Sequence, residues 1–259
     1  MESRTESNRP VALITGFSSG IGFEYSKYLA ANNWDLELVA QNPEKAKKSF
    51  DLLSYAHSRY HLCDLSKPKG VKDMVSKINQ PNLIIANAGI TKYGEIGSIS
   101  KNERESLFYL LCHGVIDLLE EYVPSMIHKG EGRIVIISSI GAITPMPKSS
   151  IYASAKSAIY SYGQSLAKEL SDKNISVTVS LPGYVHTEAH DRAGLNHLKH
   201  KVPSWMWVSA DQVVIETEKA SLKNKSRVIP GIVYKLVSPF LKMSIANKIW
   251  TALTNRKKT

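Results

Sequence analysis

The sequence predicts an α/β fold built on a doubly wound parallel β-sheet. Short apolar runs alternate with segments of helical periodicity along most of the 259 residues, which is typical of βαβ units. The runs are apolar almost without interruption, as expected for strands covered by helices on both faces. No linker rich in Pro, Gly or Ser divides the chain. We therefore expect a single domain over residues 1–259, with ligands at the carboxyl ends of its strands.

Each element is predicted from its own pattern. Strands are expected at residues 11–15, 35–40, 59–63, 82–86, 133–138, 175–181 and 227–230. Helices are expected at 20–31, after Asn42-Pro43, after Ser66-Lys67-Pro68, at 100–128 with a bend before Pro124, at 151–171, and after Ser209, whose spacing to Gln212 is that of a capping box. Residues from about 183 to 210 break the alternation, so we expect a substrate loop or lid there. A basic amphipathic tail follows from about residue 232 to 259.

The composition limits the classes of ligand and the cellular location that we expect for this protein. The net charge of +10 would attract a phosphorylated cofactor or an anionic substrate, and no nucleic-acid-binding motif accompanies it. Cys63 and Cys112 stand in apolar stretches and are expected to be buried free thiols, which suits a reducing compartment. The N-terminal segment is polar, and no apolar run approaches the roughly 20 residues that span a bilayer. We therefore expect a cytoplasmic protein.

Residues 15–22, TGFSSGIG, join the first strand to the first helix. Glycines in such a loop allow a tight turn, and the helix N-terminus offers N–H groups and a partial positive charge to a pyrophosphate. We interpret the loop as a dinucleotide site; the alternative is an ordinary strand-to-helix turn. The second strand ends in Val39-Ala40-Gln41-Asn42, without the acidic residue that would bind a ribose 2′-hydroxyl. With Lys45 nearby, this favours NADP(H) over NAD(H).

Two further strand ends carry polar or small residues. Asp64 could accept a hydrogen bond from the adenine amino group, or could simply cap a helix or turn. Asn87-Ala88-Gly89 would let the cofactor ribose approach closely, or would form a plain turn.

Tyr152 and Lys156 lie one helical turn apart in IYASAKSAIYSYG. A free tyrosine has a pKa of about 10. A lysine ammonium nearby favours the phenolate and lowers that value, so Tyr152 is a candidate general acid or base for a carbonyl or an alcohol. A Tyr–Lys pair of this spacing arises readily by chance when it stands alone. Here the pair indicates a catalytic site because the glycine loop, Asn87-Ala88-Gly89 and Ser139 accompany it.

Together these motifs resemble the short-chain dehydrogenase/reductase family. The matching pieces are TGFSSGIG (15–22), CDL (63–65), NAG (87–89), GRIVIISS (132–139), YASAK (152–156) and PGYVHT (182–187), in the family's order over residues 11 to about 190. The resemblance implies a Rossmann-type fold and an NAD(P)-dependent oxidoreductase acting on CH–OH or C=O groups. Within the family, the chain is similar to hydroxysteroid-dehydrogenase-like and 3-oxoacyl-reductase-like enzymes.

The resemblance also implies roles for single residues. Ser139 would hydrogen-bond the substrate carbonyl, Tyr152 would donate the proton, and Lys156 would lower the pKa of Tyr152 and bond the nicotinamide ribose. The cofactor-binding residues, besides Tyr152 and Lys156, would be Gly16, Ser18, Ser19, Ile21, Gly22, Gln41, Asp64, Leu65, Asn87, Ala88, Gly89, Pro182, Gly183, Val185 and Thr187. A homodimer or homotetramer would form through the helices at 100–128 and 151–171.

One position departs from the family pattern. The family carries an asparagine three residues before a glycine that aligns with Gly114, and here that position is Leu111. In the family, that asparagine helps to hold a water between the active-site lysine and bulk solvent. Leucine cannot hydrogen-bond, so we expect a weakened proton relay and reduced but real activity.

Alternatives remain for several features. Trp205 and Trp207 would wall a pocket for a medium-sized lipophilic ketone or secondary alcohol, or would pack the loop onto the body. No carboxylate or thiol set completes a metal site with His186, His190, His197 and His200, so we expect no metal. The basic tail would close the core or, as a weaker alternative, contact a membrane surface. Two rival functions are a dinucleotide sensor or scaffold without turnover, and an isomerase or dehydratase with bound cofactor.

Overall fold

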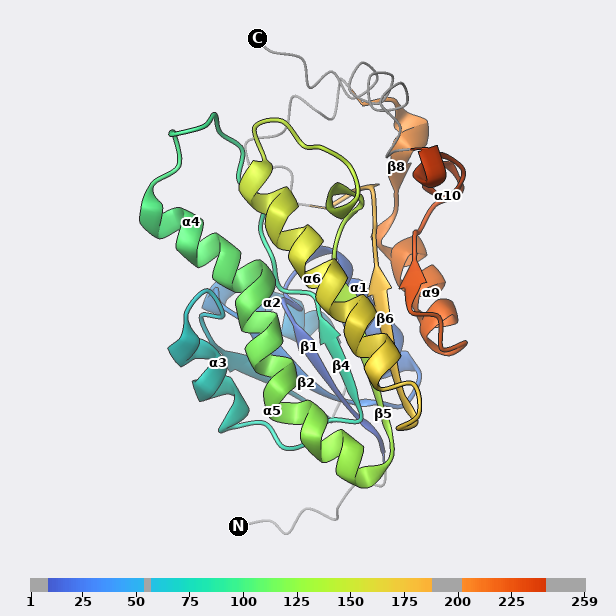
Figure 1. Ribbon diagram of the computed structural model, residues 1–259. Helices are drawn as coiled ribbons and strands as arrows, with labels where there is room; N and C mark the ends of the chain where they lie inside the picture. Colours follow the sequence, from blue (N-terminus) through green and yellow to red (C-terminus); the bar gives the residue numbers. More distant parts are fainter. Residues whose placement is uncertain (1–8, 54–56, 188–201, 241–259) are drawn as a thin grey trace.

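The computed structural model describes residues 9–53, 57–187 and 202–240. Their centre is a parallel sheet of seven strands in the order β3-β2-β1-β4-β5-β6-β9 (Figure 1). The strands are β1 (Val11–Thr15), β2 (Asp35–Ala40), β3 (Ser58–Leu62), β4 (Leu83–Ala86), β5 (Gly132–Ile137), β6 (Ile175–Ser180) and β9 (Arg227–Val228). All neighbouring pairs run parallel. The predicted doubly wound α/β fold is confirmed.

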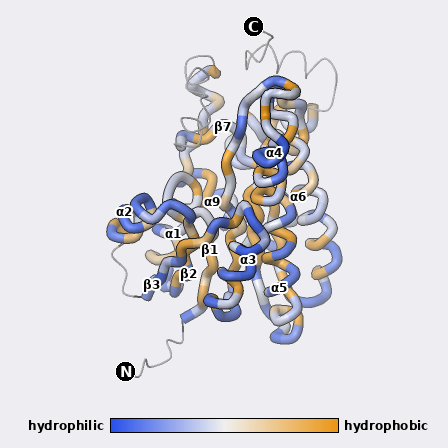
Figure 2. Tube along the Cα trace, turned by 90° about the vertical axis from the view of Figure 1, so that its left-hand side faces the viewer, coloured by the Kyte–Doolittle hydropathy of each residue, from blue (hydrophilic) through white to orange (hydrophobic). Residues whose placement is uncertain are grey.

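Helices cover both faces of the sheet. One layer contains α3 (Pro68–Val75), α4 (Lys101–Phe108), α5 (Gly114–Lys129) and α6 (Ser150–Glu169); the other contains α1 (Gly20–Ala31), α2 (Pro43–Leu53) and α9 (Ala210–Ser221). Successive β1 residues divide between the two layers, because strand side chains alternate: Leu13 packs with the first layer and Ile14 with the second. The central strands are correspondingly apolar (Figure 2), which explains their uninterrupted apolar sequences.

The strand order reverses between β1 and β4. After β1 the chain moves outward to β2 and β3, and it then returns to the other side of β1 with β4. The connections after these two neighbouring strands therefore diverge, which opens a crevice at their carboxyl ends. This switch point positions the candidate site.

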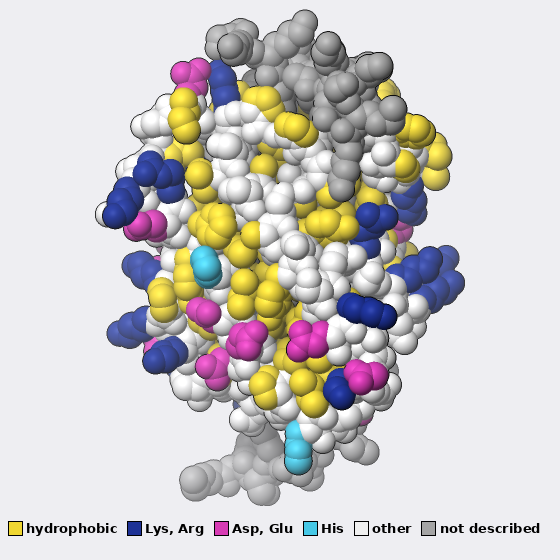
Figure 3. All heavy atoms as spheres, in the orientation of Figure 1, with side chains coloured by type: hydrophobic (Ala, Val, Ile, Leu, Met, Phe, Trp, Pro, Cys, Tyr) yellow, Lys and Arg dark blue, Asp and Glu magenta, His cyan; other side chains and the backbone are white. Residues whose placement is uncertain are grey.

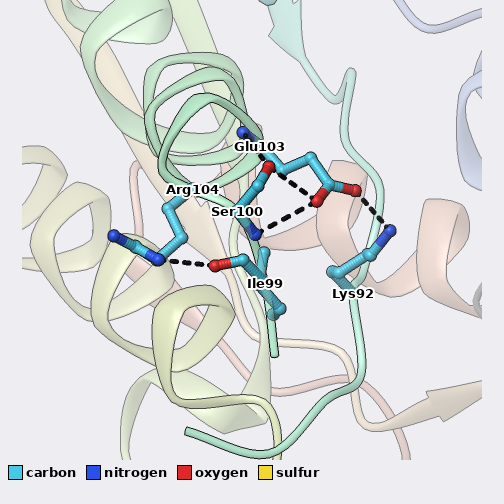
Figure 4. Close-up of polar contacts among 5 residues, drawn as sticks. All are labelled: Lys92, Ile99, Ser100, Glu103 and Arg104. Atoms are coloured by element: carbon cyan, nitrogen blue, oxygen red, sulfur yellow. Dashed lines mark hydrogen bonds and ion pairs between the residues drawn. The ribbon is translucent and has the colours of Figure 1, made fainter. Parts of the chain in front are cut away.

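A capping box fixes the start of α4 (Figure 4). The Ser100 hydroxyl accepts a hydrogen bond from the Glu103 N–H, and the Glu103 carboxylate accepts one from the Ser100 N–H. Glu103 also lies 2.7 Å from the Lys92 ammonium. Lys92 and Ser100 together lower the pKa of Glu103 to about 2. The loop before the helix is thereby tied to its first turn.

The long helix expected at 100–128 is not uniform. A π-helical turn, η1 (Tyr109–His113), separates α4 from α5, while Pro124 lies inside α5. Gly114 begins α5 where a Cβ atom would lie 3.1 Å from the Tyr109 carbonyl oxygen and 3.3 Å from the Leu65 carbonyl oxygen. The glycine therefore lets the helix approach the turn after β3 closely. π-Turns often occur at functional sites, and this one contains Leu111.

The expected substrate loop contains short regular elements. β7 (Tyr184–Val185) pairs in parallel with β8 (Trp207–Val208), which follows a 3₁₀ turn, η3 (Ser204–Met206). One half of the capping box expected at the next helix is present, because the Ser209 hydroxyl accepts a hydrogen bond from the Gln212 N–H at the start of α9, while the Gln212 side chain donates to Glu216. α10 (Ile232–Val237) and the 3₁₀ turn η4 (Ser238–Phe240) follow β9. His190, His197, His200 and the tail from residue 241 lie outside the described residues.

Cys63 and Cys112 are buried and unpaired, as expected. Within the described ranges, no helix has the length and apolar character that crossing a membrane requires.

Candidate active site

A cleft of about 310 Å³ lies at the carboxyl ends of the strands. It brings together Ser139, Tyr152 and Lys156 with the glycine loop. Nearly all of the cofactor-binding residues implied by the family resemblance line it: Gly16, Ser18, Ser19, Ile21, Gln41, Asp64, Leu65, Asn87, Ala88, Gly89, Pro182, Gly183, Val185 and Thr187. Gly22, Trp205 and Trp207 are not among the described residues that line the cleft.

The glycine loop owes its shape to two left-handed residues. Gly16 has φ +72° and Gly20 has φ +56°, which L-residues with side chains rarely adopt. A Cβ atom on Gly16 would lie 2.8 Å from the Ala88 Cα, and one on Gly20 would lie 2.9 Å from the Thr187 Cγ2. The loop is therefore packed between the turn after β4 and the residues after β7, and its two left-handed glycines have space only for backbone.

Asn87 has a supporting role that sequence reasoning missed. Its side-chain amide donates to the carbonyl oxygens of Thr15 (2.9 Å) and Gly16 (3.2 Å). The Thr15 hydroxyl in return accepts the N–H groups of Asn87 and Ala88, each at 3.0 Å. This network ties the turn after β1 to the turn after β4. A short polar residue at both strand ends was the available signal, but their pairing required the strand order.

The start of α1 fits a pyrophosphate. The helix begins at Gly20, its first turn has no acidic residue, and Ser19 makes no side-chain capping bond. Helix N-termini attract anions through their N–H groups and the helix dipole. Gly22 lies behind the loop: a Cβ there would lie 2.3 Å from the Gly16 carbonyl oxygen. Its lack of a side chain lets α1 pack closely against the turn after β1.

The end of the cleft nearest β2 and β3 is polar. Gln41, Asn42 and Lys45 line it, and the Asn42 side chain accepts the Lys45 N–H at 2.8 Å, which caps α2. Asp64 accepts hydrogen bonds from the N–H and hydroxyl of Ser66. Burial opposes ionisation of Asp64, but the Ser66 hydrogen bonds and the Lys67 ammonium outweigh it and lower its pKa. Asp64 thus stabilises a turn and also faces the cleft.

Lys156 is enclosed at the other end of the cleft. Its ammonium donates to the Ile137 carbonyl oxygen at 2.7 Å, and burial lowers its pKa to about 8. Its own carbonyl accepts the Ser138 hydroxyl. Tyr152 lies half-buried one turn earlier on α6. The Ser139 hydroxyl lines the same wall and accepts the Gly141 N–H at 3.0 Å, which leaves its proton able to point toward a ligand.

Leu111 fills the space beside this lysine. The side chain is 1% exposed. A Cβ atom added to Gly89 would lie 2.9 Å from the Leu111 Cδ2 and 3.8 Å from the Lys156 Nζ. The π-turn thus directs an apolar group to the region where the family resemblance implies an amide.

The tryptophans of the expected substrate loop pack differently from each other. Trp207 lies against the rings of Tyr184 and His186, with centroids 5.5 and 4.9 Å away, and its indole N–H donates to the Val202 carbonyl oxygen. Trp205 is 56% exposed. Trp207 thus packs against β7 and the residue that follows it. These contacts correspond to the alternative in which the tryptophan packs the loop onto the body of the protein. Among the described residues, no group of three or more His, Cys, Asp or Glu side chains could hold a metal.

Comparisons with known proteins agree with this geometry. The family model described as short chain dehydrogenase matches residues 10–196. The chain is 29% identical over 184 residues to the 3-oxoacyl-[acyl-carrier-protein] reductase FabG of Chlamydia trachomatis, covering 68% of this chain and 74% of that protein. It is 30% identical over 182 residues to the oxidoreductase UcpA of Escherichia coli K12, covering 68% and 69%.

A solved structure shows the same fold over nearly the whole chain. The short-chain dehydrogenase from Sphingobium yanoikuyae in complex with NADPH superposes with a TM-score of 0.79 at 24% identity, covering 96% of each chain. The sequence match and the parallel sheet with its strand-end cleft lead to one conclusion: this chain belongs to the short-chain dehydrogenase family of oxidoreductases, which act on CH–OH and C=O groups with NAD(P).

Proposed function

We propose that this protein is an NADP(H)-dependent reductase or dehydrogenase for a lipophilic ketone or secondary alcohol, with Tyr152 as the general acid or base. The observation that carries the proposal is one cleft lined by both the glycine loop and the set Ser139, Tyr152 and Lys156. The bound cofactor would supply or accept a hydride at its nicotinamide ring. The protein would hold the reacting groups in line and move the proton.

Each residue of the set has a distinct task. Ser139 would donate a hydrogen bond to the carbonyl oxygen and orient it. Tyr152 would transfer its phenolic proton to that oxygen as the carbonyl becomes an alcohol, and would take the proton back in oxidation. Lys156 in its charged form would favour the resulting phenolate. The Ile137 carbonyl oxygen already orients the Lys156 ammonium, so this side chain needs little rearrangement when the cofactor and substrate bind.

The lining supports a neutral, apolar substrate. Beside Ser139 and Tyr152, the wall includes Ile90, Leu110, Ile140, Met146 and Tyr184. Among the described lining residues, Lys45 and Asp64 stand toward β2 and β3, and Lys156 is the only charged group toward β5 and β6. Among the residues that the structure describes, an anionic substrate would find no further cation in the cleft, whereas an alkyl or ring ketone would bury apolar surface.

The cofactor preference rests on the polar end of the cleft. Gln41 and Asn42 stand where an acidic residue would follow β2, so the turn after β2 presents no carboxylate to a 2′-phosphate. Lys45 and the N-terminus of α2 would add positive charge. A lower Michaelis constant for NADPH than for NADH is expected, and a clear preference for NADH would contradict this part of the proposal.

A ketone panel assayed with both cofactors tests the function. Loss of nicotinamide absorbance with matching alcohol formation supports the reductase. The protein is instead a sensor or scaffold if it binds NADPH but consumes none with any ketone or, in reverse, any alcohol. Product formation without net cofactor oxidation would identify an isomerase or dehydratase.

The lowered pKa of Lys156 predicts a pH dependence. Below about pH 8 the ammonium is charged and supports Tyr152; above it the lysine loses its proton and that support is lost. The value of kcat/KM for reduction should therefore fall as pH rises through about 8. The side chain in Lys156→Arg keeps its charge throughout this pH range. The fall in kcat/KM of this variant should therefore occur at a higher pH than in the wild type, even if its maximum rate is lower. If kcat/KM of the variant falls at the same pH as in the wild type, the titrating group is not Lys156.

Replacing Leu111 by asparagine tests the expected relay defect. An amide beside Gly89 and Lys156 could hold a water that leads protons to solvent, so we expect a several-fold higher steady-state rate. Burying the amide should cost about 1–3 kcal/mol of stability, so rates are compared well below the unfolding transition. Leu107→Asn, about one helical turn earlier, is the control, because Leu107 is also buried but is not among the described residues that line the cleft. No change or a loss in Leu111→Asn, relative to wild type, would count against a relay defect.

The expected homodimer or homotetramer stays a prediction. The surfaces implied by the family resemblance lie on α4, α5 and α6, which form the front layer in Figure 1.

A further inference from the structure

Helix α10 has an exposed side and a buried side. Ile232 and Leu236 are exposed, and apolar side chains gather at the upper right edge in Figure 3, where Figure 1 places this helix. Tyr234 lies two residues from each of them, about half a helical turn away, and it is completely buried. The helix therefore directs one large aromatic side chain into the body of the protein, and this side chain has no part in the mechanism proposed for Tyr152.

The Tyr234 ring lies against the backbone of Gly183. A Cβ atom added to Gly183 would lie 1.9 Å from the Tyr234 Cζ and 2.3 Å from both Cε atoms, so no side chain fits there while the ring stays in place. Gly183 and Tyr184 line the cleft, whereas Tyr234 is not among the described residues that do so. The phenol end of Tyr234 therefore packs behind this part of the wall.

The Tyr234 hydroxyl joins two segments of backbone. It accepts the Tyr184 N–H at 2.9 Å and donates to the Met206 carbonyl oxygen. Tyr184 begins β7 and Met206 directly precedes β8, so the hydroxyl bridges the two short strands near the start of both. Burial raises the pKa of Tyr234, which keeps the hydroxyl neutral and able to donate as well as accept.

Few residues fix the position of β7, because the strand is two residues long. Before the strand, the Pro182 carbonyl oxygen accepts the Ile140 N–H at 2.9 Å; after it, the His186 N–H donates to β8 at 3.0 Å. The Tyr184 N–H lies between these two points and is held by Tyr234. Loss of the Tyr234 hydroxyl would take this partner from two buried backbone groups, so we expect the short strand to shift.

Helix α10 is itself held in place from α9 and β8. The Lys235 ammonium lies 2.6 Å from a Glu216 carboxylate oxygen, and the Gly231 N–H donates to the same carboxylate at 3.3 Å. Gly231 has φ +88°, and a Cβ atom there would lie 2.9 Å from the Val208 Cγ2. The start of the helix is thus fixed, and Tyr234 holds β7 against a firm support.

This wall stands at the end of the cleft where the proposed reaction would take place. The residue that donates to the Pro182 carbonyl, Ile140, directly follows Ser139. Gln41 lies at the opposite end, after β2. A hydride passes only between atoms that are nearly in contact, so the nicotinamide ring must lie beside Ser139 and Tyr152. The adenine end of the cofactor then extends toward β2 and β3.

We propose that Tyr234 is a positioning residue for the nicotinamide end of the bound cofactor. Tyr234 holds the Gly183–Tyr184 peptide, and this peptide belongs to the wall against which the ring would be aligned. Alignment of the reacting atoms supplies a large part of an enzyme's rate. The inference rests on the proposed function, which assigns the reacting ring to the end of the cleft beside Tyr152.

Replacing Tyr234 by phenylalanine in the full chain tests the proposal, because it removes the hydroxyl and keeps the ring. We expect the Kd for NADPH to rise about fivefold or more, and the single-turnover rate of hydride transfer to a ketone to fall about 10–100-fold. The Kd for adenosine 2′,5′-bisphosphate, which carries only the adenine end, should stay within about twofold of the wild type. The pH at which kcat/KM falls should not move, because Tyr234 transfers no proton.

Tyr122→Phe is the matched control for the loss of a buried hydroxyl. Tyr122 is buried, its hydroxyl donates to the Ile78 carbonyl oxygen at 3.0 Å, and it is not among the described residues that line the cleft. Its variant should also unfold at a lower temperature, yet keep both Kd values and the rate of hydride transfer. All binding and rate measurements are made well below the unfolding transition of each variant.

A double variant tests whether Tyr234 acts through this peptide. In Gly183→Ala the added Cβ would lie 1.9 Å from the Tyr234 Cζ, so the ring must already leave the Tyr184 N–H. Gly183→Ala/Tyr234→Phe should therefore lose little more NADPH affinity than Gly183→Ala alone, whereas two independent effects would multiply.

The positioning role of Tyr234 is overturned if Tyr234→Phe weakens NADPH and the bisphosphate alike, if it changes neither Kd nor the rate of hydride transfer, or if the losses in the double variant multiply. The Kd measurements need no turnover, so the two proposals can be told apart. A wild type that binds NADPH but reduces no ketone contradicts the proposed reaction, and the two Kd values still decide the role of Tyr234. A wild type without affinity for NADPH contradicts both proposals.

Discussion

Replacing Tyr152 by phenylalanine is expected to lower kcat for ketone reduction by about 10²–10⁴-fold, the range typical of losing a general acid. The substitution removes one oxygen and leaves a ring of the same shape on α6. The cleft keeps its form, so the affinity for NADPH should stay within a few-fold of the wild type. Stopped-flow reduction and cofactor titration by fluorescence measure the two quantities separately.

Tyr160→Phe provides the matched control. Tyr160 lies two turns later on the same helix, and its hydroxyl accepts a hydrogen bond from Arg227 rather than lining the cleft. Its variant should retain nearly full turnover. Equal activity of Tyr152→Phe and the wild type would remove the basis of the proposed mechanism.

Replacing Gly22 by alanine should weaken cofactor binding strongly while leaving the catalytic residues in place. The added Cβ would lie 2.3 Å from the Gly16 carbonyl oxygen and 2.5 Å from the Asn87 side-chain nitrogen. The first contact is with backbone, which cannot rotate away, so the whole loop must shift. Overpacking of this kind costs about 1–3 kcal/mol. If that cost falls on the loop, the Kd for NADPH rises by roughly 5–150-fold.

Gly97→Ala separates this effect from a general loss of stability. Gly97 has φ +86°, and a Cβ atom there would meet nothing within 4 Å. Gly97 is not among the described residues that line the cleft, so its alanine variant should carry only backbone strain and keep the wild-type Kd. Isothermal titration with NADPH decides the matter: an unchanged Kd in Gly22→Ala would show that the loop does not hold the cofactor.

The strands and most of the helices could be predicted because their cause is local. An apolar run such as residues 82–86 is buried on both faces, and polar segments of helical period must lie outside it. The π-turn at Tyr109–His113 could not be predicted in this way. The helical pattern of residues 100–128 continues through this turn. The turn is followed by Gly114, which lies close to the carbonyl oxygen of Leu65, and Leu65 is far away in the sequence.

The residues of the candidate site also fall into two groups, those predictable from local sequence and those whose role depends on contacts in the fold. The sequence alone indicated Tyr152, Lys156 and the glycine loop, because their chemistry depends on residue type and short spacing. The sequence did not reveal that Asn87 ties two strand ends together, nor that the Tyr234 ring supports Gly183 from a helix some fifty residues later. Those contacts depend on which strands are neighbours in the sheet.

The amino-acid sequence by itself determined the fold class, the family and the residue types available for hydride-transfer chemistry, since these follow from periodicity and from motifs within single segments. Only the tertiary structure decided which of these residues share a cleft, that burial lowers the pKa of Lys156 to about 8, and that α10 displays its apolar side chains. Desolvation and exposure are properties of atoms that surround a group in space, and in this chain those atoms come from segments that are distant in sequence.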